Sequence, residues 1–118
     1  MSNPNIFSST KLYSKSGGAS VTTTETALIG NYRGSGKILK IFMLQVANNN
    51  GGNTAEVTLV LYKNSVAFNI VKSVPVPADS TIIILSKDNQ IYLEENDMLK
   101  IYGSASNLDV VYSYEELS

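Results

Sequence analysis

The sequence predicts an all-β protein, an antiparallel β-sandwich of about seven to eight strands. Short alternating or continuous apolar segments recur along the chain, and turn residues interrupt them roughly every 8–12 residues. No segment shows the apolar period of about 3.6 residues that an amphipathic helix requires. Charged residues make up 16%, and Ser, Thr and Asn take their place. Periodicity does not specify strand order, so a jelly roll and an immunoglobulin-like sandwich both fit.

The chain is expected to form one sandwich domain, residues 17–118, preceded by an N-terminal arm or edge strand, residues 1–16. The first segment is mostly polar and does not resemble a signal peptide. Gly17 and Gly18 are expected to break the chain there. The Thr-rich residues 19–29 then have the composition of an edge strand.

The strongest strand pattern lies in the middle of the chain. Residues 37–47 are apolar on both faces, which predicts a central strand covered on both sides. Residues 55–62 alternate, which places odd-numbered residues toward a core and even-numbered ones, such as Thr58, toward solvent or a partner chain. The polar segment 48–53 between them is expected to be a flexible loop, because Asn and Gly tolerate positive φ.

Shorter strands are expected in the second half of the chain, over residues 66–71, 81–85, 91–93, 98–102 and 108–114. Pro75 and Pro77 cannot lie in a central ladder, so residues 74–77 are expected to be an edge strand or a connection.

The composition excludes several kinds of chemistry. The chain has no cysteine and no histidine, so it lacks disulfides, thiolate metal sites, the commonest general base and the commonest transition-metal ligand. We therefore expect no enzyme activity, no catalytic residue, no metal ligand and no cofactor. A net charge of −1 and a pI near 5.3 predict no nucleic-acid binding, which requires a basic face. No apolar run approaches the ~20 residues of a membrane span, so no membrane association is expected.

Two segments have an alternative interpretation as binding sites. Residues 30–37, GNYRGSGK, could cradle a phosphate, but Ile38 replaces the metal-binding hydroxyl and a strand follows, so we interpret them as a hairpin loop. The carboxylates of Glu94, Glu95 and Asp97, with Asp88 nearby, could hold calcium. They lack the spacing of a dedicated calcium loop, which favours solvated turn carboxylates.

The seven tyrosines indicate either a protein interface, which tyrosine favours, or merely the high strand propensity of this residue. A sugar-stacking platform is a further alternative, although tryptophan is missing. Chemistry and expected exposure select a set of candidate interface residues: Tyr13, Tyr32, Arg33, Asn49, Asn50 and Tyr62.

Several motifs follow one another in a familiar order: LQVAN, EVTLVLYKN, VPVPADS, YLEENDMLKI and LDVVYSYEEL. This order resembles a group of small virion proteins of tailed bacteriophages, over about residues 37–117. One departure is Asn96, where the group usually has glycine before the aspartate; asparagine also tolerates a left-handed turn. The other is the glycine-rich segment 31–36, which is longer and more polar than the usual entry to the first strand.

The resemblance implies a non-enzymatic structural protein of the particle, first of all a capsid decoration (cement) protein. Such a protein binds the major capsid protein on the outside of the shell, typically as a homotrimer. The implied location is the capsid surface of the virion, after assembly in the host cytoplasm. The alternative is a neck, tail or fibre component that binds a host glycan or another protein.

Overall fold

The computed structural model describes residues 12–118, and all the regular structure in this range is β-strand. The predicted all-β class is therefore confirmed. Residues 1–11, which include most of the predicted N-terminal arm, lie outside the described residues. The nine strands are β1 (Leu12–Val21), β2 (Thr26–Asn31), β3 (Ile38–Asn48), β4 (Ala55–Lys63), β5 (Val66–Val76), β6 (Thr81–Leu85), β7 (Ile91–Leu93), β8 (Asp97–Gly103) and β9 (Leu108–Leu117).

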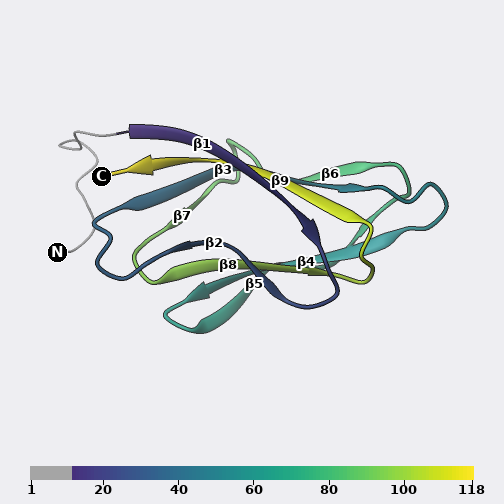
Figure 1. Ribbon diagram of the computed structural model, residues 1–118, viewed down its shortest axis with the longest axis horizontal. Helices are drawn as coiled ribbons and strands as arrows, with labels where there is room; N and C mark the ends of the chain where they lie inside the picture. Colours follow the sequence, from purple (N-terminus) through teal and green to yellow (C-terminus); the bar gives the residue numbers. More distant parts are fainter. Residues whose placement is uncertain (1–11) are drawn as a thin grey trace.

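The strands form two antiparallel sheets that pack face to face (Figure 1). One sheet has the order β1-β9-β3-β6, with β7 also paired to β3, and the other has the order β2-β8-β4-β5. Because β6 and β7 pair with the same strand, β3, they share one position in the sheet. Each sheet therefore has four strand positions, and the two sheets face each other. Strands that follow one another in the sequence mostly belong to opposite sheets, which is the arrangement of a jelly roll. Strand order thus separates the jelly roll from the immunoglobulin-like alternative.

The core lies between the sheets and consists of aliphatic side chains. The largest fully buried ones are Ile41, Leu44, Leu59, Leu85, Leu93, Leu99 and Leu108. Tyr112 and Tyr114 of β9 are partly buried and pack against this core. The odd-numbered residues of β4 pack in this core as predicted, but the strict alternation is not kept, because Val60 is buried as well.

The prediction that the central strand β3 is covered on both faces is wrong. A β-bulge lies between Ile41 and Met43, where β3 pairs with β9. Leu39 and Ile41 face the core before the bulge, and Leu44 and Val46 face it afterwards. The extra residue moves the core-facing positions from odd to even numbers, because successive side chains alternate between faces. The run of apolar residues is continuous because core-facing residues are odd-numbered before the bulge and even-numbered after it, and not because both faces of the strand are covered.

Thr58 also differs from its prediction, since it is buried and not turned to solvent. It lies opposite a bulge in β5, where the backbone N–H of Ser73 donates to Thr58 Oγ1 at 3.0 Å. The hydroxyl satisfies an amide that the irregular ladder leaves without its usual partner.

Two strand boundaries also differ from the prediction. Gly17 and Gly18 do not break the chain but lie within β1, which pairs with β9 along its whole length. Residues 19–29 are not one strand: β1 ends at Val21, and β2 begins at Thr26 in the other sheet. β-propensity alone did not reveal this turn, because three of its four residues are threonines, which are common in strands.

Segment 30–37 is not a hairpin loop, because it joins β2 of one sheet to β3 of the other. The loop between β3 and β4 crosses between the sheets in the same way, and β4–β5 is the tight hairpin of the described chain. The prediction for residues 74–77 is confirmed, since Pro75 lies in β5, an edge strand. Residues 12–118 contain no helix long and apolar enough to cross a membrane.

Candidate interaction surface

The sandwich has two ends that carry different loops. From Ile38 to Asn48, β3 spans about 33 Å at ~3.3 Å per residue, so the two ends are far apart. The terminal end contains the start of β1, the end of β9, the loop 32–37, the turn 64–65 and the turn 94–96. The distal end contains the loops 22–25, 49–54, 77–80 and 104–107. In Figure 1 the terminal end is on the left, where the C-terminus is marked.

The structure does not bring the six predicted interface residues together. Tyr13, Tyr32 and Arg33 belong to the terminal end, in β1 and in the loop 32–37. Asn49 and Asn50 belong to the distal end. Tyr62, near the end of β4, lies on the solvent side of the β2-β8-β4-β5 sheet.

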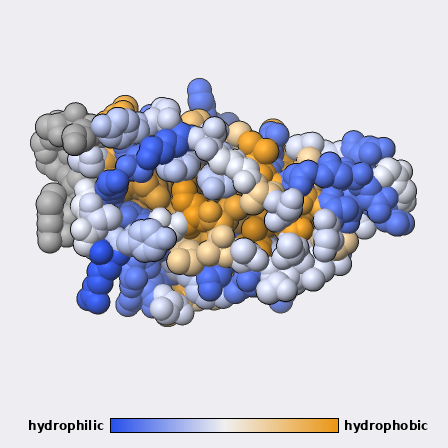
Figure 2. Space-filling view, viewed as in Figure 1, coloured by the Kyte–Doolittle hydropathy of each residue, from blue (hydrophilic) through white to orange (hydrophobic). Residues whose placement is uncertain are grey.

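Most of the exposed large apolar side chains lie toward the terminal end. They are Leu12, Tyr13, Tyr32, Val66, Phe68 and Tyr92, and we refer to them as the terminal apolar set. Tyr32 is the most exposed, at 77%. The other two exposed large apolar residues, Ile83 and Val111, lie opposite the same β3 residue, Gln45, on the sheet that contains β1. Figure 2 shows that apolar side chains also reach the surface along the seam between the two sheets.

The loop 32–37 is held by a carboxylate of the same chain. The backbone N–H groups of Gly34 and Gly36 donate to the two oxygens of Glu95, at 3.0 and 2.9 Å. Both glycines have positive φ, 81° and 69°, which aligns their amides toward one anion. The two amides therefore bind an anion of the same chain, the Glu95 carboxylate.

Asn31 fixes the base of this loop. Its buried side-chain amide donates to the carbonyl oxygens of Lys37 and Leu93, at 2.8 and 2.9 Å. Its Oδ1 accepts from the Ser35 hydroxyl at 2.6 Å. These contacts join β2, the loop and the end of β7. Sequence reasoning missed this residue, and the only available signal was a polar residue between an apolar strand and a glycine-rich loop.

The carboxylates of Glu95 and Asp97 in the acidic turn 94–97 have partners within the same chain. Asp97 is buried and forms an ion pair with Lys63 at 2.7 Å, and the N–H of Glu94 donates to the same carboxylate oxygen at 2.9 Å. The hydrogen bond to Asp97 raises the pKa of Lys63. Among residues 12–118 there is no cluster of three or more side chains that could hold a metal ion. The prediction of solvated turn carboxylates is therefore wrong for Glu95 and Asp97, which stabilise the terminal end.

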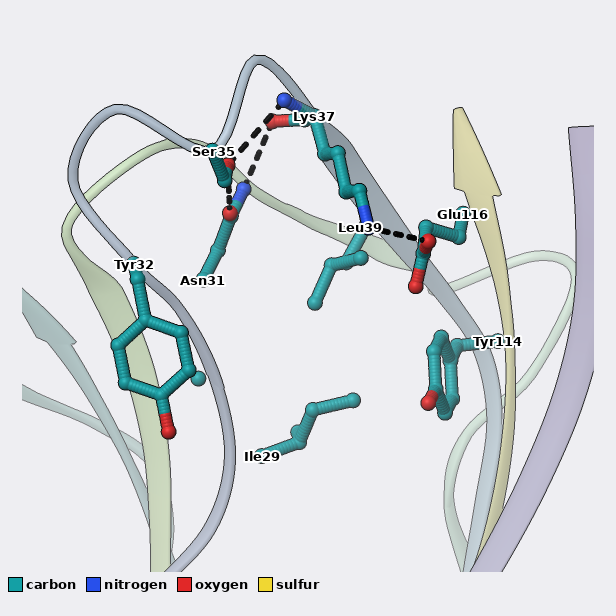
Figure 3. Close-up of a pocket in the computed structure, with 9 residues that line it drawn as sticks. Ile29, Asn31, Tyr32, Ser35, Lys37, Leu39, Tyr114 and Glu116 are labelled. Atoms are coloured by element: carbon teal, nitrogen blue, oxygen red, sulfur yellow. Dashed lines mark hydrogen bonds and ion pairs between the residues drawn. The ribbon is translucent and has the colours of Figure 1, made fainter. Parts of the chain in front are cut away.

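A small pocket of about 200 Å³ opens between the sheets at this end (Figure 3). Ile29, Leu39 and Tyr114 provide its apolar wall, and Tyr32 lies across from Tyr114. At the rim, Glu116 pairs with Lys37 at 2.8 Å and with Lys15 at 3.2 Å. The hydrogen bond from Lys37 holds the pKa of Glu116 below its usual value, and the same bond raises the pKa of Lys37.

The distal end is organised by Asn48, whose hydrogen bonds link the loop over residues 48–53 to neighbouring segments. The buried amide of Asn48 donates to the carbonyl oxygens of Asn53 and Val76, both at 2.9 Å. Its Oδ1 accepts from the backbone N–H of Asn50 and from the amide of Asn107. Asn48 therefore joins three loops, an arrangement that residue composition cannot indicate.

Tyr62 is already partnered within the chain. Its hydroxyl donates to Glu25 at 2.6 Å, and this hydrogen bond raises the pKa of Tyr62. The ammonium of Lys100 lies 4.4 Å from the centre of its ring, a cation–π contact. These contacts tie β4 to β8 and to the β1–β2 loop, so Tyr62 has a structural use in the monomer.

No protein-family model matches the chain, and no curated protein matches it in sequence. Among solved structures, it is similar to a chain from Bacillus endospore appendages, described as a novel family of disulfide-linked pili, with a TM-score of 0.54. The similarity covers 91% of this chain and 85% of the other, at 13% sequence identity. The shared feature is the fold.

Proposed function

We propose that this protein is a non-enzymatic structural protein of a tailed-phage virion. Its specific role would be capsid decoration, in which it binds the major capsid protein on the outer shell and stabilises the particle. The observation that carries this proposal is the terminal apolar set, which projects from an end whose loops are fixed by internal hydrogen bonds and ion pairs. The motif order described above supports the virion context.

The chemistry of the terminal end suits a protein partner. Tyr and Arg are enriched at interface cores. Tyr32 and Arg33 are consecutive, exposed residues of the loop that Glu95 holds. Burial of exposed apolar area contributes about 25 cal/mol per Å², part of which offsets the entropy lost on association. A pre-ordered loop loses little further entropy, so this end is suited to binding.

Repeated weak contacts would be sufficient for a shell-covering protein. If the protein assembles as a trimer, each subunit presents two different surfaces to its neighbours and the ring closes. Simultaneous engagement of several capsid subunits then raises the overall affinity without additional strong contacts.

A neck, tail or fibre component is the second candidate, and the fold likeness favours it because the similar structure comes from a bacterial appendage. That appendage is described as disulfide-linked, whereas this sequence has no cysteine. A fibre built from this chain would therefore be held together by non-covalent contacts, for example by pairing of strands from neighbouring chains.

The copy number of the chain in purified virions tests the proposal, measured by quantitative mass spectrometry against the major capsid protein. A tail protein of the same particle provides the low-copy reference. We expect a copy number of the same order as that of the capsid protein. A copy number close to the tail reference would transfer the role to the neck, tail or fibre, and complete absence from the particle would contradict both candidates.

A further inference from the structure

Asn50-Gly51 is the only Asn-Gly step in the sequence, and it lies in the distal loop 49–54. We propose that this step is a self-modification site. The backbone nitrogen of Gly51 attacks the side-chain amide of Asn50, and Asn50 is converted through a cyclic imide to aspartate or isoaspartate. Glycine permits this attack because it has no side chain to shield its nitrogen.

The loop holds the two reacting groups together. Asn50 Oδ1 accepts hydrogen bonds from the N–H groups of Gly52 and Asn53, at 2.8 and 3.2 Å. The ring closed by the Gly52 hydrogen bond contains both the Asn50 amide carbon and the Gly51 nitrogen, so the side chain is folded over the peptide that attacks it. The Asn50 backbone is fixed on both sides, through its N–H to Asn48 Oδ1 and through its carbonyl oxygen to the N–H of Asp79.

The same contacts favour the reaction chemically. Attack on the amide carbon places negative charge on Asn50 Oδ1, where two N–H donors are already directed, as in an oxyanion hole. The carboxylate of Asp79 lies against Gly51: a Cβ built on Gly51 would be 3.2 Å from Asp79 Oδ2. Because this carboxylate lies beside Gly51, we assign Asp79 the role of the general base that removes the Gly51 amide proton.

The step balances without any redox partner. Asp79 accepts the proton from Gly51 N, a bond forms between that nitrogen and the Asn50 amide carbon, and the bond to the departing nitrogen breaks. The leaving group takes up a proton and departs as ammonia. Water then opens the five-membered imide at either carbonyl, which gives aspartate or isoaspartate.

The product places a new carboxylate in a loop next to Asp79. The isoaspartate form also lengthens the backbone of a segment that Asn48 joins to two other loops. The modification is therefore expected to loosen the distal end selectively.

The test follows conversion of Asn50 in the full-length chain by peptide mapping, with isoaspartate detected by enzymatic methylation. Folded protein is incubated at neutral pH beside the same chain in guanidinium chloride. We expect conversion to be faster in the folded chain, and Asp79→Asn to slow it by roughly tenfold. Asparagine tolerates the positive φ of 54° at position 79, so this variant retains the turn.

Gly51→Ala and Gly52→Ala form a matched pair. The first shields the attacking nitrogen and should suppress conversion, whereas the second places a methyl group in the same loop and leaves the Asn50-Gly51 step intact. Circular dichroism verifies that each variant is folded. The proposal is overturned if the folded chain reacts no faster than the denatured one, or if folded Asp79→Asn reacts at the wild-type rate.

Discussion

Gly17 illustrates how a partly buried side chain that packs against the core, Tyr112, determines its neighbour in the edge strand. A Cβ built on Gly17 would lie 2.6 Å from Tyr112 Cζ, so the tyrosine ring occupies the space above this residue. The Tyr112 hydroxyl reaches across the sandwich and donates to the Leu28 carbonyl at 3.4 Å. Burial raises the pKa of Tyr112. Gly17 is therefore a packing requirement of β1 and not a strand break.

We expect Gly17→Ala to destabilise the protein by about 1–3 kcal/mol, because the methyl group overlaps the Tyr112 ring. Gly18→Ala is the control: its nearest neighbour would be 3.4 Å away, so it should change the free energy of unfolding little. Urea denaturation of both variants provides the comparison. Equal effects at the two positions would show that the tyrosine does not constrain Gly17.

Glu116 gives a prediction about pH. Lys37 and Lys15 lower the pKa of Glu116 from the ordinary value of 4.5. Because its folded-state pKa is the lower one, the carboxylate contributes stability above pH 4.5, and this contribution is lost as the pH falls through the folded-state pKa. We expect Glu116→Gln to be less stable than wild type at pH 7 and equally stable in strong acid. Urea midpoints measured across this range test it, and a constant difference would contradict the assignment.

At the scale of elements, the β4–β5 hairpin combines a strained turn with exposed apolar residues. Asn64 and Ser65 have positive φ, 52° and 69°, as a type I′ turn requires. Serine adopts this conformation at a cost that glycine avoids. Val66 and Phe68 of the terminal apolar set follow this turn at the start of β5. The geometry of the turn therefore positions part of the candidate interface.

Ser65→Gly should stabilise the protein by roughly 0.5–1 kcal/mol, since Asn-Gly is the preferred sequence for this turn. Thermal unfolding measures the change. Ser86→Gly, in the loop after β6, is the control and should not stabilise. A Ser65→Gly variant that is no more stable than wild type would mean that the turn is not strained.

Most strands could be predicted from the sequence because one buried face gives a local, period-two signal. The irregular elements could not. Because of the bulge after Ile41, the sequence of β3 resembles an apolar strand with two covered faces. The threonines at 22–24, in the loop between β1 and β2, resemble a continuation of a strand. Both errors arise because a bulge or a polar corner alters the phase of a strand without an unusual residue type.

At the scale of the molecule, the all-β class followed from composition and periodicity, whereas sheet membership depends on contacts distant in sequence. The candidate site shows the same division. The exposure of Tyr13 and Tyr32 could be anticipated. The capture of Glu95 by the loop 32–37, and the distance of Asn49 and Asn50 from that loop, depend on strand order.

The double variant Tyr32→Ala/Arg33→Ala tests the terminal end as an interface. Both side chains are exposed, so the free energy of unfolding should change by no more than about 0.5 kcal/mol. Assembly should weaken by roughly tenfold, the effect of losing an interface anchor. Light scattering measures self-assembly, and binding to particles stripped of this protein measures its affinity for the shell. Ile83→Ala removes an equally prominent side chain from another surface as the control. Unchanged occupancy would remove Tyr32 and Arg33 from the interface.

The pairing of β1 with β9 determines how the sandwich responds to tension. Leu12 lies opposite Leu117, so force applied through these two residues pulls the strands apart from their paired ends. Their hydrogen bonds then break one after another, as in unzipping, and not all at once, as in shear. β9 remains held by β3 on its other side. Under such a force β1 would therefore yield first and extend, while β9 and the aliphatic core stayed in place.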